Sequence, residues 1–172
     1  MDVATLKSKI KQKNIPQFLI FSGDEWEVQK IYINQILKVT KKEQKRIDSI
    51  ADVYSSLKNR SFVSNSYCYI ARDDKVFMEN ESLQEQIKSG LLKDNLYILL
   101  LTNIDKRTKF YKKFVEDIVI FEALSEQALI KYIQAQIKLS TQNAKKLIEV
   151  CESNYGRILS EIDKIRRYVD AT

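Results

Sequence analysis

The sequence contains no histidine among its 172 residues. Histidine is the commonest general base at neutral pH and the commonest metal ligand, so its absence argues against hydrolytic chemistry and zinc sites. Proline and glycine are also scarce, with one and three residues, which leaves little room for long irregular loops. We therefore expect closely spaced helices and strands and no enzyme that depends on histidine.

Only two cysteines are present, Cys68 and Cys151, and they lie far apart within apolar patterns. Neither belongs to a C-x-x-C pair, so we interpret both as buried, reduced thiols of a cytoplasmic protein rather than as a disulfide or a metal site. The longest apolar run, Leu96–Leu101, has the length of a strand, which predicts no membrane span. The amino-terminal residues show no apolar segment of a secretory signal, which also favours a cytoplasmic location.

The most informative absence lies between Phe18 and Glu27, where an apolar strand, a glycine turn and a helix start follow one another. An α/β nucleotide-binding domain places its phosphate loop there, with several glycines, a lysine and a hydroxyl residue. In this chain Gly23 stands alone, and Asp24 and Glu25 follow it. Carboxylates at a helix amino terminus stabilise the helix but repel a polyphosphate. We predict a degenerate phosphate loop at these three residues, with Asp24 as the helix N-cap and no bound cofactor.

Apolar residues make up 44% of the chain, which is ample for a core, and their spacing alternates between strand and helix periods. Strands are expected at 17–22, 46–50, 66–72, 95–102 and 117–122, and helices at 3–13, 24–39, 52–60, 82–92 and 106–114. This alternation predicts an α/β domain with a doubly wound, mainly parallel sheet. The nearly continuous apolar run at 95–102 is typical of a central strand that is buried on both faces.

The strand pattern stops after residue 124, and three amphipathic helical stripes follow it. Three helices without a strand form a small bundle. The sequence therefore predicts two domains, an α/β domain at 1–124 and a three-helix domain at 125–172.

Three stretches of the chain resemble the δ subunit of the DNA polymerase III clamp loaders of bacteria and phages, in a divergent form. The first is FLIFSGDEWEVQKI, the second contains LYILLLTNIDKRTKFYKKF and IVIFEALSEQALIKYI, and the third is NAKKLIEVCESNYGRILSEIDKIRRY. The third stretch carries the glycine of the family's lid, followed by its E-x-x-K pattern. That pattern falls at Glu161, Ile162, Asp163 and Lys164. Together the stretches span nearly the whole chain in the family's order.

The resemblance implies an AAA+-like module without a functional phosphate loop, followed by a lid domain. In that family the δ subunit hydrolyses no ATP, so the chain is expected to be no enzyme, although it would belong to a DNA polymerase holoenzyme. The resemblance also implies that it binds a β-type sliding clamp and helps to open it during DNA replication, with other clamp-loader subunits and primed DNA as further partners. The family's collar domain has no counterpart in these 172 residues, which we expect to be a shortened or a naturally short form.

The family contacts the clamp through a helix and an exposed hydrophobic pair that precede the strand corresponding to Ser66–Arg72. By position, Ser61 and Phe62 match the pair, with Leu57 before it and Val63 after it. Ser61 departs from the family because a hydroxyl replaces an apolar side chain, which weakens the pair. Burial of Phe62 alone would contribute about 1.5–3 kcal/mol to clamp binding. The alternative interpretation is that Phe62 and Val63 lead into the core of the sheet.

Basic residues outnumber acidic ones by 29 to 23, and the net charge of +6 permits contact with a polyanion without demonstrating it. Around Phe110 basic residues alternate with aromatic ones, a pattern that permits a nucleic-acid contact. Helical spacing can turn the aromatics inward and the charges outward, so the pattern favours a solvated helix face. The candidates for contacts with DNA or with other subunits are Arg107, Lys109, Arg166 and Arg167. Acidic residues on the same lid helices favour ion pairs within the molecule instead.

Asp73 and Asp74 follow a predicted strand, as a Walker-type metal ligand would. Without a phosphate site a metal has nothing to bridge there, so we expect no metal. Two other functions stay open at this point. One is a degenerate AAA+-like DNA-binding or scaffold module with no clamp contact, and the other is a nucleotide hydrolase with an unrecognised phosphate site.

Overall fold

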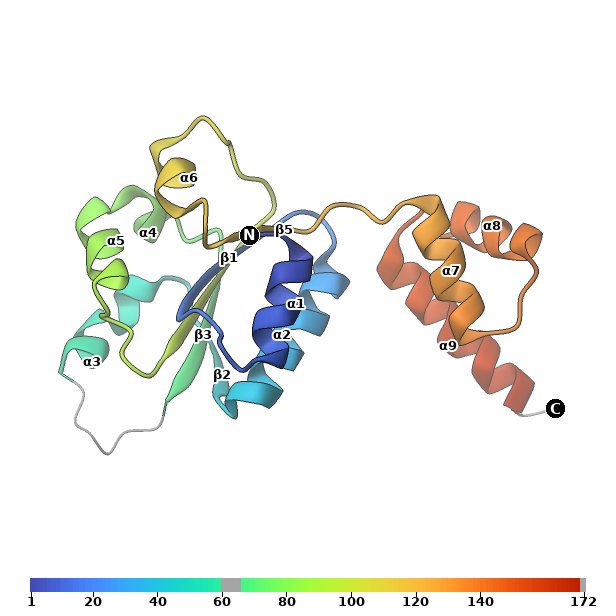
Figure 1. The fold of residues 1–172 in the computed structure, drawn as a ribbon, viewed down its shortest axis with the longest axis horizontal. Coiled ribbons are helices and arrows are strands. Elements are labelled where there is room, and N and C mark those ends of the chain that lie inside the picture. Colours follow the sequence, from blue (N-terminus) through green and yellow to red (C-terminus); the bar gives the residue numbers. More distant parts are fainter. Residues whose placement is uncertain (60–65, 171–172) are drawn as a thin grey trace. The chain divides into compact units, whose positions relative to one another are not determined.

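The computed structural model describes residues 1–59 and 66–170, with the side chains of all of them except Val169 and Asp170. In Figure 1 the ribbon follows this chain from its amino to its carboxyl end. The chain forms two compact units, which we describe separately. The first unit comprises Met1–Asp24 and Ile31–Phe121, and the second comprises Glu25–Lys30 and Glu122–Thr172.

Within the described part of the first unit, five strands form one sheet in the order β2-β3-β4-β1-β5 (Figure 1). The strands are β1 (Phe18–Ser22), β2 (Glu43–Arg46), β3 (Tyr67–Arg72), β4 (Leu96–Leu101) and β5 (Ile118–Ile120). Every neighbouring pair is parallel, with Phe18 opposite Tyr97 and Glu43 opposite Tyr67. The predicted parallel α/β sheet is confirmed, and β4 is its central strand, buried along its full length.

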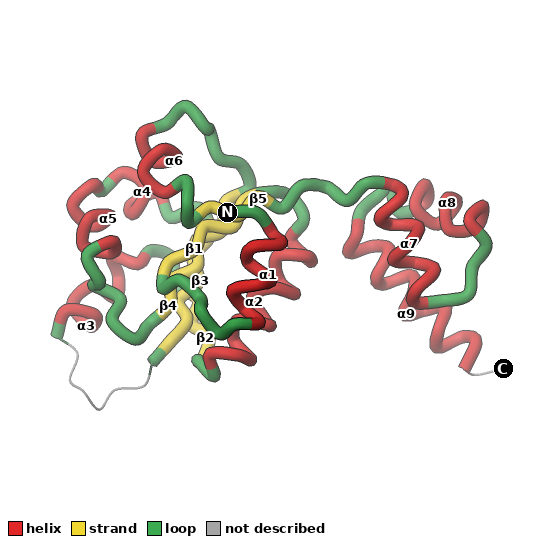
Figure 2. The backbone as a smooth tube through the Cα atoms, viewed as in Figure 1, coloured by secondary structure: helices red, strands yellow, loops and turns green. Residues whose placement is uncertain are grey.

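Helices cover both faces of the sheet (Figure 2). One face carries α1 (Val3–Lys11) and the part of α2 (Trp26–Thr40) that belongs to this unit. The other face carries the short helix η1 (Ile50–Val53), α3 (Tyr54–Lys58), α4 (Lys75–Glu79), α5 (Glu81–Lys88) and α6 (Lys109–Phe114). Side chains of a strand alternate between faces, so the buried strands β1, β3, β4 and β5 feed two apolar layers, whereas the edge strand β2 is exposed.

Aromatic side chains fill the layer between the sheet and α4–α6. The ring centre of Phe18 lies 5.3 Å from that of Phe77, 5.3 Å from that of Tyr97 and 5.1 Å from that of Phe114. The contacts with Phe77 and Phe114 are edge-to-face, an arrangement that the ring quadrupoles favour. Burial of these rings fixes helices that are too short to be stable alone, such as the six-residue α6.

Several predicted boundaries are wrong by a few residues, and local capping explains the differences. α2 begins at Trp26, so Asp24 precedes the helix and is not its N-cap. α6 begins directly after Thr108, whose side-chain oxygen accepts the backbone N–H of Tyr111 in the first turn of the helix. The strand predicted at 46–50 ends early because Ser49 forms a capping box that starts η1.

In the second unit α7 (Glu126–Gln136), α8 (Thr141–Val150) and α9 (Tyr155–Asp170) pack around an apolar core, so the predicted three helices are present. The core also takes in Val28, from the first turn of α2, which explains why Glu25–Lys30 belongs to this unit. The sequence had assigned that turn to the α/β domain. One turn of a fourth helix therefore accompanies the three-helix bundle.

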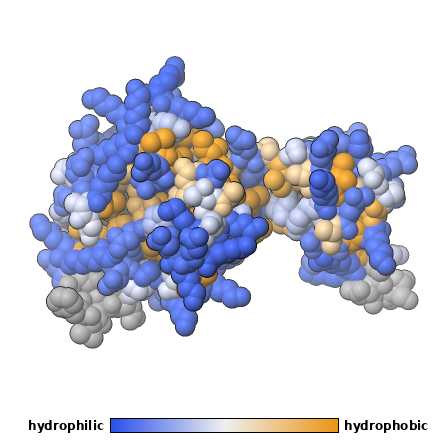
Figure 3. Space-filling model, in the orientation of Figure 1, coloured by the Kyte–Doolittle hydropathy of each residue, from blue (hydrophilic) through white to orange (hydrophobic). Residues whose placement is uncertain are grey.

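Both cysteines are free and buried, as predicted. Burial raises the pKa of Cys68 to about 12, so this thiol is protonated and unreactive at neutral pH. On the face shown in Figure 3, hydrophobic residues gather in the middle of the first unit and hydrophilic residues cover its outer parts. None of the helices in the described ranges is both long and apolar enough to cross a membrane.

Candidate functional site

Gly23 directly follows β1 and has a backbone conformation that residues with a side chain rarely adopt, with a φ of +126°. A Cβ atom at this position would lie 2.2 Å from the backbone oxygen of Phe121. The Gly23 N–H donates to the carbonyl oxygen of Leu101 over 3.1 Å, and the Phe121 N–H donates to that of Ser22 over 2.8 Å. The glycine therefore allows two backbone segments to approach closely, and its amide extends the sheet instead of lining a phosphate cradle.

The residues after Gly23 oppose phosphate binding by their charge. Asp24 is exposed, and Glu25 and Glu27 are half-buried at the start of α2. Negative charge at this end of a helix is favourable for the helix and unfavourable for an anionic ligand nearby. The one glycine amide already donates to a carbonyl oxygen of the sheet, and three carboxylates follow it. This arrangement does not fit the phosphates of a nucleotide.

Within the second unit, the first turn of α2 packs against the start of α9. A Cβ atom added at Gly156 would lie 2.8 Å from Cγ of Glu27, so the two segments are in close contact. Burial raises the pKa of Tyr155, and the nearby carboxylate of Glu25 adds to the effect. The acidic turn thus serves packing in this unit.

Asp74, which follows β3, is a buried acceptor for three hydrogen bonds. Its side chain is 2% exposed. Oδ1 accepts the Phe77 N–H over 2.9 Å, while Oδ2 accepts the Ile50 N–H and the Tyr97 hydroxyl, each over 2.8 Å. Burial, followed by the charge of Asp74, raises the pKa of Tyr97, so the phenol stays protonated and keeps donating. Asp74 therefore ties η1, α4 and β4 together.

This role of Asp74 was not predicted from the sequence, which suggested the residue only as a candidate metal ligand. Among the residues that the structure describes, no cluster of three or more acidic, cysteine or histidine side chains is arranged to hold a metal. A signal for the structural role was present, since an aspartate just before a short helix is a common N-cap. The helix it caps, α4, has five residues and shows no periodicity that would reveal it.

The segment predicted to contact a clamp is described only in part. Leu57 lies on α3 and is 1% exposed, packed in the core against the sheet. Its side chain anchors α3 and is not an exposed contact, which corrects its predicted role. Ser61, Phe62 and Val63 lie outside the described residues, and their role stays a prediction.

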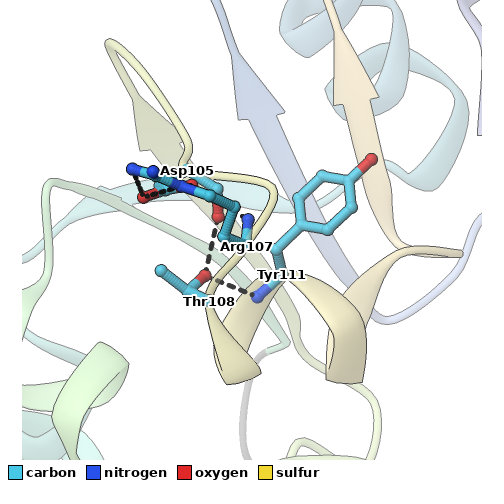
Figure 4. A network of polar contacts seen from close by, with 4 residues as sticks. All are labelled: Asp105, Arg107, Thr108 and Tyr111. Carbon is cyan, nitrogen blue, oxygen red and sulfur yellow. Dashed lines mark hydrogen bonds and ion pairs between the residues drawn. The ribbon is translucent and has the colours of Figure 1, made fainter.

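The basic turn before α6 is organised by Asp105 (Figure 4). The Arg107 guanidinium donates to both carboxylate oxygens of Asp105 over 2.9–3.2 Å, and these bonds lower the pKa of the carboxyl. Thr108 Oγ1 donates to the Asp105 carbonyl and accepts the Tyr111 N–H. Arg107 is 91% exposed but already paired, whereas Lys109 is exposed without an ion pair to a described residue.

The candidate arginines of the lid make contacts within their own unit. Arg166 donates to the backbone oxygen of Gln136 at the end of α7, over 3.0 Å from Nη2. Arg167 pairs with Asp163 on the same helix at 2.5 Å. These contacts agree with the expected intramolecular pairing, and a role of either arginine toward DNA or another subunit stays a prediction.

The E-x-x-K pattern of the lid forms one turn of α9. Lys164 pairs with Glu161 at 2.6 Å on the surface, while Ile162 between them is buried in the core of the bundle. Exposed pairs of this kind contribute little to stability. The pattern therefore marks an amphipathic helix and supplies no chemistry of its own.

Comparison with known proteins identifies the fold. No protein-family model and no curated protein sequence matches the chain. Among solved structures it is similar to the DNA clamp loader delta protein (YqeN) of Bacillus subtilis, with a TM-score of 0.64 and 14% sequence identity. The similarity covers 97% of this chain and 57% of that protein, so the chain spans little more than half of its length. The fold is that of a clamp-loader δ protein.

Proposed function

We propose that the chain is a clamp-loader δ-type subunit, which binds a β-type sliding clamp and helps to open it during DNA replication without hydrolysing ATP. The observation that carries the proposal is the structural similarity to the Bacillus subtilis clamp loader delta protein over nearly the whole chain. A fold by itself does not determine function, so the site must supply the second argument. That argument is the turn at Gly23, which suits packing and does not fit a phosphate.

The absence of a phosphate cradle agrees with this role. A subunit that holds a clamp in place can do without nucleotide chemistry when neighbouring subunits of the loader supply it. The proposed partners are therefore the clamp and other clamp-loader subunits, with primed DNA close by. Arg107, exposed on the turn before α6, and Lys109, the exposed first residue of α6, are the proposed contacts of the first unit with DNA or a neighbour.

Phe62, together with Val63, is the proposed contact with the clamp. The segment that contains them follows α3, which is held to the core by Leu57 and by a hydrogen bond of 2.6 Å from the Tyr54 hydroxyl to Gln86. A rigid support just before a contact segment lowers the entropy cost of binding. An aromatic residue that fills a partner's pocket is the usual centre of such an interface.

The Phe62→Ala variant is expected to bind the cognate clamp about 10- to 150-fold more weakly, because the 1.5–3 kcal/mol of apolar burial is lost. A pull-down of the clamp with wild type and variant measures the effect. Val76→Ala is the matched control, since Val76 is 52% exposed elsewhere on the first unit and should leave binding unchanged. Clamp binding that ignores Phe62→Ala would remove Phe62 from the interface, and a wild type that captures DNA but no clamp would favour a DNA-binding module.

A further inference from the structure

The exposed side of α6 carries lysines because its other side is fixed in the core. Phe110 and Phe114 lie four residues apart on one side of the helix, and both are buried against the sheet. Lys109 and Lys112 lie three residues apart on the other side and are exposed. Neither lysine forms an ion pair with a described residue. Burial of the two rings therefore holds two unpaired ammonium groups toward the solvent.

The turn before α6 adds two further cations. A hydrogen bond of 3.2 Å from the Thr108 N–H to the Asp105 carbonyl oxygen closes the turn, so Lys106 and Arg107 are its two central residues, and both are exposed. Arg107 holds Asp105 through Nε and Nη2, which leaves its Nη1 without a partner among the described residues (Figure 4). We call Lys106, Arg107, Lys109 and Lys112 the basic face.

Nearby carboxylates neutralise only a part of this charge. Asp105 pairs with Arg107 at 2.9 Å, and Glu85 of α5 pairs with Lys113 at 2.5 Å, outside the basic face. Glu116, two residues past the end of α6, is exposed and forms no ion pair with a described residue. The four cations of the basic face thus outnumber the carboxylates beside them.

Helix stability does not account for the basic face. The dipole of a helix is positive at the amino end, so cations there are unfavourable, yet Lys106, Arg107 and Lys109 lie at or just before that end of α6. The first turn of α6 contains no acidic residue that would offset them. Lys109 and Lys112 also repel each other as like charges on one side of a helix. A bound polyanion would turn each of these unfavourable terms into a favourable one.

We propose that the basic face binds the phosphate backbone of duplex DNA without reading its sequence. The proposal rests on the proposed function and deepens it, because it names the partner of the exposed cations of the first unit. Protein interfaces are depleted in lysine and centred on aromatic or apolar anchors, whereas α6 turns Phe110 and Phe114 inward. Interfaces with DNA are polar and strongly positive, and a lysine ammonium binds phosphate as a point charge. Contacts of this kind carry no sequence information.

The test is binding of a fluorescein-labelled DNA duplex to the whole chain, measured by fluorescence anisotropy over a range of salt concentrations. Lys109→Gln/Lys112→Gln removes two charges of the basic face. The matched control is Lys7→Gln/Lys11→Gln, which removes the same charge at exposed, unpaired lysines of α1, on the other face of the sheet (Figure 2).

Each lysine that contacts a phosphate adds about one to the slope of log affinity against log salt concentration. We therefore expect Lys109→Gln/Lys112→Gln to reduce this slope by about two and to bind the duplex about tenfold more weakly at low salt. The control should keep the slope of the wild type. Because all four lysines are exposed, the thermal melting curves of both variants should match that of the wild type.

Four outcomes would overturn the proposal. The first is a wild type that does not bind the duplex, and the second is an equal loss in both variants, which would reflect net charge alone. The third is a lowered melting temperature with an unchanged salt slope, which would mean that the lysines act through folding. The fourth is a Lys109→Gln/Lys112→Gln variant that binds the duplex normally but loses the clamp, which would make the basic face a protein contact. A wild type that binds the duplex through the basic face but binds no clamp would contradict the proposed function alone.

Discussion

Replacement of Gly23 by alanine is expected to lower the free energy of unfolding by about 3 kcal/mol or more. The added Cβ would lie 2.2 Å from the backbone oxygen of Phe121, and neither backbone segment can move without breaking sheet hydrogen bonds. The φ of +126° adds strain for any residue with a side chain. Because small domains are stable by only about 5–15 kcal/mol, the variant should lose a large part of its stability in a urea titration.

Gly90→Ala is the control that separates conformational strain from collision. Gly90 also has a positive φ, +96°, but a Cβ atom there would meet nothing within 4 Å. Only the strain applies, and we expect a cost of about 1–2 kcal/mol. Equal losses of unfolding free energy at the two glycines would contradict the close approach of Gly23 to Phe121. The turn would then again be a candidate ligand-binding loop.

Asp74→Ala is expected to destabilise the protein by about 3–5 kcal/mol, because it leaves two backbone N–H groups and the Tyr97 hydroxyl buried without an acceptor. The three groups lie on η1, α4 and β4, so the loss should be cooperative across the first unit. Chemical denaturation followed by circular dichroism measures the change.

Asp73→Asn is the matched control for Asp74. Asp73 is exposed and has a φ of +49°, a conformation that asparagine tolerates as well as aspartate does. We expect a change within about 0.5 kcal/mol. Tyr97→Phe should fall between the two, since it removes one of three donors to Asp74. A loss below about 1 kcal/mol in Asp74→Ala would show that the carboxylate is not a central support.

The sheet was predictable because its signals are long and mutually consistent. The apolar run at 95–102 could be buried on both faces only as a central strand, and β4 holds that place. Alternating helices then required a parallel arrangement. Element boundaries were less predictable, since they depend on single capping bonds such as those of Ser49 and Thr108, which compete with the periodic pattern.

The candidate site was predictable in its chemistry and less so in its geometry. The lone Gly23 with its acidic neighbours indicated a turn without phosphate chemistry, but nothing in the sequence reveals that Phe121 lies against it. Leu57 was assigned to a contact by its position along the chain. That position does not tell which side of a five-residue helix faces the sheet, and the structure buries it.

The division into units depends on contacts of the first turn of α2 that the sequence does not reveal. Helical periodicity predicted three helices after residue 124, and it also predicted α2 as one helix of the α/β domain. Val28 packs against the core of the three helices, and Glu27 contacts the segment around Gly156. Gly156, at the start of α9, would usually be attributed to a turn. Here it also makes room for the side chain of Glu27.

Titration of the cognate sliding clamp with the wild-type chain, with and without Mg-ATP, tests the central claim most directly. The account predicts specific binding with the same dissociation constant in both conditions, because a ligand that does not bind the chain cannot shift its equilibria. Fluorescence anisotropy of labelled clamp gives the constant at equilibrium. Absence of binding by the wild type, or binding that appears only with nucleotide, would contradict the account.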